Sequence, residues 1–75
     1  MEVPLVVKFF IEASDVLAGK VDLDRIDATY VLLYNTGVVT PGFFEKLLEA
    51  VNYMAKFGWR LRACLQNNCI MEKQS

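Results

Sequence analysis

The strongest pattern in the chain is a helical repeat of apolar residues between Thr40 and Phe57. Thr40 is a good N-cap, Pro41 suits the first helical position, and Gly58 suits the residue after the last turn. Apolar residues at i, i+3 and i+4 spacing predict the face that packs on the core: Phe44, Leu47, Leu48, Val51, Met54 and Ala55. Further apolar residues recur along one flank: Phe43, Ala50 and Phe57. The helix therefore carries more apolar surface than one small sheet needs.

Two stretches with strand character lie on either side of this helix. Residues 29–34 form an uninterrupted β-branched and aromatic run, which is typical of a central strand. After Gly58 the side chains alternate, and one face of the predicted strand carries Trp59, Leu61, Ala63 and Leu65. The other face carries Arg60, Arg62 and Cys64. The dipeptide Asn67-Asn68 predicts a tight turn into a closing strand that ends at Lys73.

The register of this hairpin decides what the two cysteines do. A two-residue turn at Asn67-Asn68 places Cys64 opposite Met71, so the thiols lie diagonally and stay apart. A four-residue loop over 65–68 would instead place Cys64 opposite Cys69. We favour the first register, and we therefore expect two reduced thiols that bind no metal.

The N-terminal stretch fits two structures. As a helix, residues 5–17 place one apolar stripe opposite Lys8, Glu12 and Asp15, with Gly19 after the last turn. As a strand, the same residues alternate between two faces, which their β-branched and aromatic content favours. We choose an N-terminal helix within residues 1–19, with an extra strand as the alternative. Residues 20–28 follow as an acidic, solvated connector, and residues 29–73 form a strand–helix–hairpin unit.

The order strand, helix, Gly58-Trp59-x-Leu61, short turn and closing strand ending Met71-Glu72-Lys73 resembles a known family. It is similar to the small prokaryotic family catalogued as domain of unknown function 4177, over residues 29–73 only. The resemblance implies an α+β fold in which one amphipathic helix covers a small three-stranded antiparallel sheet. It implies no activity and no functional residue.

Composition adds an argument for self-association. The chain has 75 residues, which allows one domain, yet 55% of them are hydrophobic. So small a domain cannot enclose all of this apolar surface. We therefore expect a homo-oligomer, with a dimer favoured. The residues left over by the best apolar stripes form the predicted interface: Leu5, Val7, Ile11, Phe43, Ala50 and Phe57.

Charge and chemistry narrow the function without fixing it. The net charge is −1 and histidine is absent, so neither a nucleic-acid surface nor a histidine-based catalytic site is favoured. No signal peptide or membrane-spanning run is predicted, and a cytoplasmic location is expected. The leading interpretation is a non-enzymatic protein-interaction or self-assembly module without cofactor or metal. The alternative is a nucleic-acid-binding accessory protein whose contacts would be Arg60, Arg62 and Lys73. A redox or metal role for Cys64 and Cys69 comes third.

Overall fold

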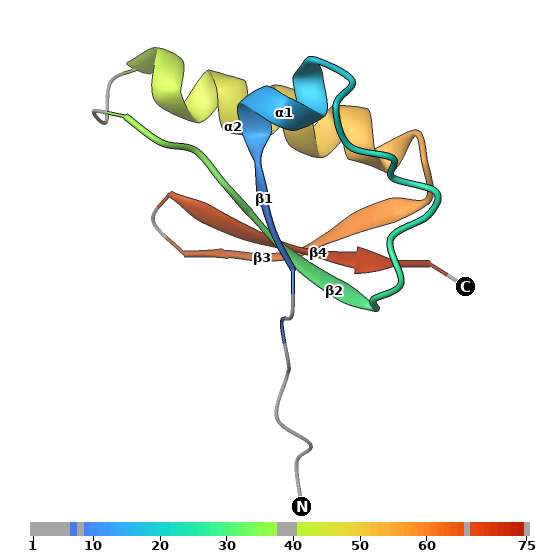
Figure 1. Ribbon diagram of the computed structural model, residues 1–75. Helices are drawn as coiled ribbons and strands as arrows, with labels where there is room; N and C mark the ends of the chain where they lie inside the picture. Colours follow the sequence, from blue (N-terminus) through green and yellow to red (C-terminus); the bar gives the residue numbers. More distant parts are fainter. Residues whose placement is uncertain (1–6, 8, 38–40, 66, 75) are drawn as a thin grey trace, which may run out of the picture.

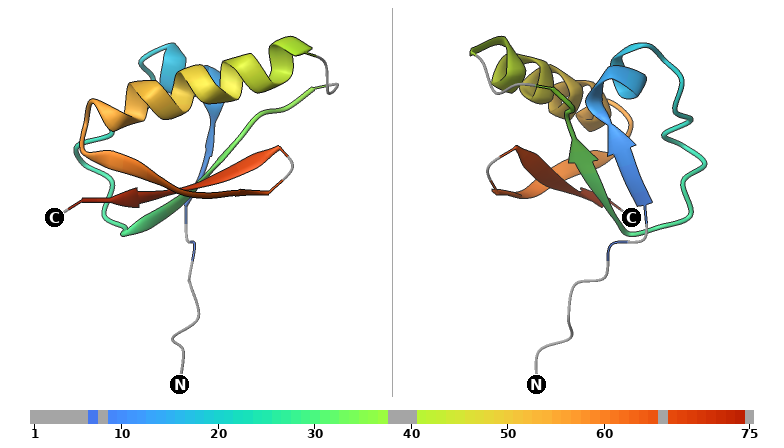
Figure 2. Two further views of the ribbon diagram at one scale, coloured as in Figure 1. Left: turned by 180° about the vertical axis from the view of Figure 1, so that it is seen from behind. Right: turned by 60° about the vertical axis from the view of Figure 1, so that its left-hand side comes forward.

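The computed structural model describes residues 7, 9–37, 41–65 and 67–74. Its elements follow in the order β1 (Phe9–Glu12), α1 (Ala13–Leu17), β2 (Tyr30–Tyr34), α2 (Pro41–Ala55), β3 (Trp59–Leu65) and β4 (Asn68–Lys73). The strands form one sheet in the order β1-β2-β4-β3, in which β1 is parallel to β2 and the other neighbours are antiparallel. Both helices lie on the same side of this sheet, and the described residues place no helix on the other side (Figures 1 and 2). The predicted small α+β fold is confirmed, with one strand more than expected.

That extra strand comes from the N-terminal stretch, which combines both structures considered for it. The chain pairs with β2 from Phe9 to Glu12 and turns into α1 at Ala13. A helix over the whole stretch is therefore wrong, because the aromatic and β-branched residues 9–11 form a strand instead. The part of the stretch before residue 7 lies outside the described residues.

The phase of α2 differs from the prediction. The helix buries Phe43, Leu47, Ala50, Val51 and Met54, so the supposed flank residues Phe43 and Ala50 belong to the covered face. Three residues predicted for the core are exposed instead: Phe44 to 44%, Leu48 to 55%, and Ala55. The physical reason is α1, which packs against α2 and widens the face that α2 covers beyond the sheet alone. The predicted N-cap Thr40 lies outside the described residues.

Trp59, the first residue of β3, links the sheet to the connector over residues 20–28. Its side chain is 1% exposed, and its indole Nε1 donates a hydrogen bond to the backbone carbonyl of Leu23 at 3.0 Å. Leu23 is itself buried, so the connector is attached to the core at its centre and is more than a solvated linker. Gly58 precedes Trp59 at φ 86°, the left-handed conformation predicted for the end of α2.

A β-bulge changes the hairpin. Leu61 pairs with Met71 and Ala63 pairs with Ile70, so Arg62 is an extra residue on β3. The extra residue reverses the alternation after Leu61, because Ala63 and Leu65 then share a face with Ile70 and Asn68 rather than with Met71. The expectation that Ala63 and Leu65 face the same side as Trp59 is therefore wrong.

The position of the turn joins the two cysteines. Leu65 pairs with Asn68, so the turn lies one residue earlier than predicted, and Cys64 pairs directly with Cys69. Their Cα atoms lie 4.1 Å apart, and their sulfurs form a disulfide. The expected reduced thiols are a wrong prediction, and the expected cytoplasmic location loses the support of reduced thiols. Within the described residues, neither helix has the length and hydropathy that a membrane crossing requires.

Candidate interaction surfaces

The face of the sheet that carries no helix is the most distinctive surface of the molecule. Cross-strand pairing places one residue of each strand in a single row: Phe10, Leu32, Ile70 and Ala63, in the order β1, β2, β4 and β3. All four are apolar, and the row crosses the whole width of the sheet. Phe10 is 65% exposed, and Leu32 and Ile70 are half-buried although they belong to the two inner strands. We call this surface the open face.

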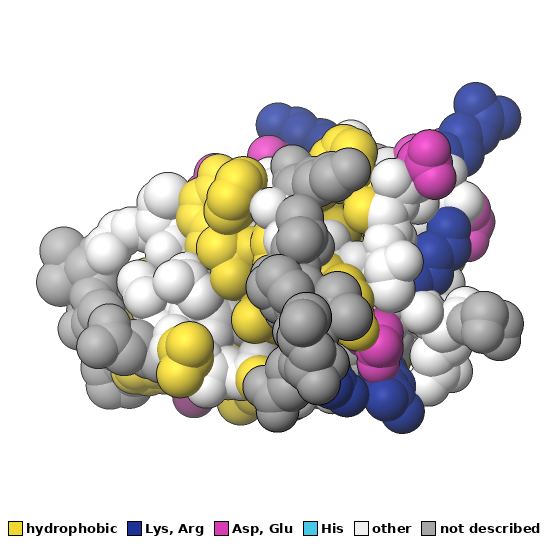
Figure 3. Space-filling model, turned by 90° about the horizontal axis from the view of Figure 1, so that it is seen from below, with side chains coloured by type: hydrophobic (Ala, Val, Ile, Leu, Met, Phe, Trp, Pro, Cys, Tyr) yellow, Lys and Arg dark blue, Asp and Glu magenta, His cyan; other side chains and the backbone are white. Residues whose placement is uncertain are grey.

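Two further rows lie beside the apolar row. On one side, pairing aligns Glu12, Tyr34, Asn68 and Leu65. On the other side it aligns Tyr30, Glu72 and Arg60 on β2, β4 and β3. Leu65 is 72% exposed, the largest exposed fraction among the exposed large apolar side chains of the described residues. Figure 3 views the molecule from this side, with hydrophobic side chains gathered towards the middle and charged side chains towards one side.

The charged end of the open face is organised around Glu72. Arg60 contacts one Glu72 carboxylate oxygen through Nη2 and donates to it through Nε, both at 2.9 Å. The Tyr30 hydroxyl beside Glu72 holds the pKa of that carboxyl below its ordinary value, and Arg60 and Arg62 act in the same direction. The Glu72 carboxylate in turn raises the pKa of the Tyr30 hydroxyl. These groups therefore form a coupled polar cluster that fixes the end of the apolar surface.

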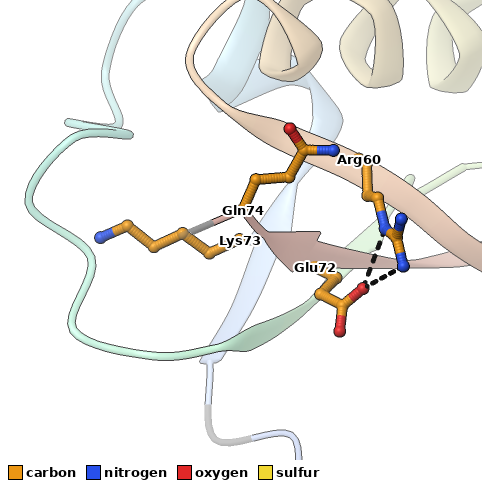
Figure 4. A pocket seen from close by; sticks show the side chains of 4 residues that line it. All are labelled: Arg60, Glu72, Lys73 and Gln74. Atoms are coloured by element: carbon orange, nitrogen blue, oxygen red, sulfur yellow. Dashed lines mark hydrogen bonds and ion pairs between the residues drawn. The ribbon is translucent and has the colours of Figure 1, made fainter.

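The end of β4 also borders a shallow hollow of about 330 Å³, lined by Arg60, Glu72, Lys73 and Gln74 (Figure 4). Its arginine is already bound to Glu72, and its lysine extends away from Arg60 towards the connector, where Nζ donates to the carbonyl of Ile26 at 3.2 Å. The charged atoms of this hollow thus satisfy one another or the backbone. This arrangement stabilises the end of the sheet and offers little for ligand binding.

The predicted interface residues are divided by the structure. Ile11, Phe43 and Ala50 are buried within the chain at 8%, 5% and 0% exposure, so their assignment to an exposed interface is wrong. They are buried because β1 joins the sheet and α1 covers α2, which the helical interpretation of residues 5–17 did not include. Val7 is half-buried, Phe57 is exposed to 39%, and Leu5 lies outside the described residues.

The residues proposed for nucleic-acid contact do not form one patch. Arg60 pairs with Glu72 on the open face, whereas Lys73 pairs with Trp59, whose side chain points to the opposite face. Successive residues of a strand alternate between faces, so Glu72 and Lys73 cannot both line the open face. Arg62 is exposed at the bulge of β3.

Exposed apolar side chains also occur on the helical side, on α2 and the edge strand β3. Phe44, Leu48 and Leu61 are exposed to 44%, 55% and 46%. Phe57 is exposed to 39%, and Phe9, exposed to 43%, lies in one cross-strand row with Leu61, so this side also carries several exposed apolar side chains. The described residues contain no group of three or more acidic, cysteine or histidine side chains placed to hold a metal ion.

Sequence reasoning missed most of the open face. Phe10, Leu32 and Ile70 received no functional role, because the rows appear only when the order β1-β2-β4-β3 and its registers are known. One signal was present: the uninterrupted apolar run of β2 is typical of a strand buried on both faces. The structure buries Val31 and Leu33 but leaves Tyr30, Leu32 and Tyr34 half-buried.

A scan against protein-family models found no match, and searches of curated proteins and of solved structures found none either. The resemblance to the family of domain of unknown function 4177 therefore stays a prediction.

Proposed function

We propose that this protein is a non-enzymatic self-assembly module that docks a second copy of itself through the open face. The observation that supports it is the row Phe10, Leu32, Ile70 and Ala63, which crosses all four strands without cover from a helix. Antiparallel sheets that face water alternate apolar and polar residues, with the polar ones outward. An outward row with no polar residue is typical of a surface that meets another protein.

Edge-to-edge pairing of sheets is the less favourable way to assemble, because one edge strand, β1, has only the four residues Phe9–Glu12. The edge strand β3 contains a bulge at Arg62 and carries a second arginine, Arg60. Bulges and charged side chains on an edge strand hinder the addition of a further strand. The open face has no such protection, so face-to-face packing is the better use of the exposed surface.

The size of the open face sets the strength of the association. With strands about 4.8 Å apart and residues about 3.3 Å along each strand, four strands of about five residues present roughly 300 Å² of planar area. Standard-size interfaces bury about 800 Å² per partner. We therefore expect a weak, reversible dimer that dissociates at micromolar concentration and forms as concentration approaches the millimolar range.

The experiment compares two matched double variants by sedimentation velocity over that concentration range. Phe10→Ser with Leu65→Ser removes the two most exposed apolar side chains of the open face, and both residues tolerate polar groups because they are 65% and 72% exposed. Phe44→Ser with Leu48→Ser removes exposed apolar side chains from α2 instead. We expect the first variant to stay monomeric and the second to associate like the wild type. A wild-type protein that stays monomeric throughout would refute the proposal.

Nucleic-acid binding is the second candidate and has weaker support. It has in its favour the aromatic residues Tyr30 and Tyr34 on the open face, which could stack on bases. Against it, Arg60 is bound to Glu72 and Lys73 lies on the other face. A salt-dependent shift on mixed oligonucleotides at the concentrations used above would favour this candidate.

A further inference from the structure

The charges at the corners of the open face indicate how two copies would face each other. Glu12 lies on β1 in the row that ends with Leu65 on β3. Arg60 lies on β3 in the row on the other side of the apolar row. Glu12 and Arg60 therefore occupy opposite corners. Arg60 contacts Glu72 through Nε and Nη2, but its side chain is 55% exposed and a guanidinium has five N–H donors, so a second carboxylate can approach it. The Glu12 carboxylate accepts a hydrogen bond from the Thr36 hydroxyl at 2.7 Å.

The open face is nearly square, which limits its symmetric arrangements. The four strands are separated by three spacings of about 4.8 Å, which gives about 14 Å across the sheet. The outer rows are four residues apart, and a rise of about 3.3 Å per residue gives about 13 Å along the strands. A face-to-face dimer has a two-fold axis in the plane between its sheets. The axis runs along the strands, across them, or along one of the two diagonals.

Only one of these axes pairs the corner charges. An axis along the strands places Glu12 over Leu65 of the second copy, and an axis across the strands places Arg60 over Leu65 of the second copy. One diagonal places Glu12 over Glu12 and Arg60 over Arg60, which brings like charges together. The other diagonal passes through the Leu65 corner and places each Glu12 over Arg60 of the second copy.

We propose that two copies of the chain pack through their open faces about this last diagonal, with two Glu12–Arg60 pairs between the copies and strands that cross near a right angle. The proposal rests on the proposed function and adds the arrangement of the dimer. Orthogonal packing is one of the two arrangements that stacked sheets adopt. The diagonal arrangement also brings the Leu65 side chains of the two copies together. It places Phe10 over the row of the second copy that contains Tyr30, so the largest exposed apolar side chains of this face are covered.

The test mixes two charge-reversed variants, Glu12→Arg and Arg60→Glu. Each variant alone has two repulsive contacts in its own dimer, and we expect each to self-associate about tenfold more weakly than the wild type. In an equimolar mixture, the heterodimer pairs Arg at position 12 with Glu at position 60 at one site and retains the native pair at the other. We therefore expect the mixture to associate about as strongly as the wild type in sedimentation equilibrium.

Three controls accompany the mixture. Arg25→Glu reverses a charge on the connector, where the side chain is 87% exposed, and should leave association unchanged. Glu12→Gln keeps an acceptor for Thr36 but removes the charge, and should fall between wild type and Glu12→Arg. The order of association strength, wild type above Glu12→Gln above Glu12→Arg, tests the arrangement independently of Arg60→Glu. It therefore serves if Arg60→Glu unfolds because it loses the contact with Glu72. Circular dichroism verifies the fold of every variant.

The outcomes separate the two proposals. If Phe10→Ser with Leu65→Ser prevents association while the charge variants and their mixture behave like the wild type, the diagonal arrangement is wrong and the self-assembly function stands. If mixing gives no recovery from two weakened variants, the arrangement is also wrong. If the wild type is monomeric at every concentration, both proposals fail.

Discussion

At the scale of single residues, Trp59 combines complete burial with a hydrogen bond to a distant part of the chain. It is the largest side chain that is fully buried, and its indole bonds to the Leu23 carbonyl across 36 positions of sequence. We expect Trp59→Ala to lower the free energy of unfolding by about 3–5 kcal/mol. Trp59→Phe keeps most of the packing but leaves the buried carbonyl unpaired, so its cost should be about 1–2 kcal/mol. Urea denaturation measures both, and a Trp59→Phe protein as stable as the wild type would contradict the role given to the hydrogen bond.

Glu72 gives a second prediction at this scale, concerning pH. The Tyr30 hydroxyl, with Arg60, lowers the pKa of Glu72 in the folded protein. A carboxyl whose folded pKa is depressed stabilises the fold above its ordinary pKa and loses that contribution as pH falls through the folded value. We therefore expect Glu72→Gln to reduce stability at neutral pH and to lose less stability on acidification than the wild type. Thermal midpoints between neutral pH and pH about 3 measure this difference. Glu49→Gln, on an exposed position of α2, should follow the wild-type curve.

At the scale of elements, the sequence predicted the position of α2 well and its rotation poorly. The bounds follow from local signals, since Pro41 and Gly58 act on neighbouring residues. The rotation depends on what packs around the helix, and α1 could not be placed from the sequence because residues 5–17 fitted two structures. The apolar stripe of α2 is wider than the sheet alone can cover. The rotation of the helix about its axis is therefore decided by tertiary contacts.

Two adjacent leucines of α2 test the observed phase. Leu47 is 4% exposed and Leu48 is 55% exposed, although both were predicted for the core. Leu47→Ala should cost about 2–4 kcal/mol because it leaves a cavity. Leu48→Ala should change stability by no more than about 0.5 kcal/mol because the side chain is largely in water. Both variants remove the same atoms, and chemical denaturation measures the stability that each one loses. A larger loss for Leu48→Ala than for Leu47→Ala would contradict the observed rotation of α2.

The hairpin of β3 and β4 also depended on a feature that the sequence did not predict. The pair Leu65–Asn68 places the turn one residue earlier than predicted, which changes the partner of Cys64 from Met71 to Cys69. A bulge has no strong local signal, since Arg60 and Arg62 fit an ordinary alternating strand equally well. The disulfide is the chemical consequence of the turn that lies one residue earlier than predicted.

A cysteine variant measures what the disulfide contributes. The bond closes a short loop, with a sequence separation of five residues. A loop of about six residues corresponds to roughly 2 kcal/mol in the chain-entropy model. We expect Cys64→Ala with Cys69→Ala to lose about this much, and reductant to lower the stability of the wild type without affecting the variant. Free thiols in the untreated folded protein, detected by titration, would contradict the bond.

At the scale of the whole molecule, the fold class followed from the sequence while the surface did not. Helix, strands and turn each have local signals, and together they indicated an α+β unit. The open face combines Phe10 from β1 with Ile70 from β4, which are 60 positions apart in sequence and brought into one row by the sheet order. Composition correctly indicated a surplus of apolar residues, but only the topology shows which of them form a continuous row on the open face.

Self-assembly through that face predicts that stability depends on protein concentration. A dimer is more stable than its monomer by an amount that grows with concentration, because association removes folded monomer from the unfolding equilibrium. For the wild type we expect the thermal midpoint to rise by about 2–6 °C between micromolar and near-millimolar protein. Phe10→Ser with Leu65→Ser should have a midpoint that is independent of concentration. At low concentration it should match the wild type closely, because both side chains are largely exposed in the monomer. The same rise in both proteins would show that the open face is not the surface through which the chains associate.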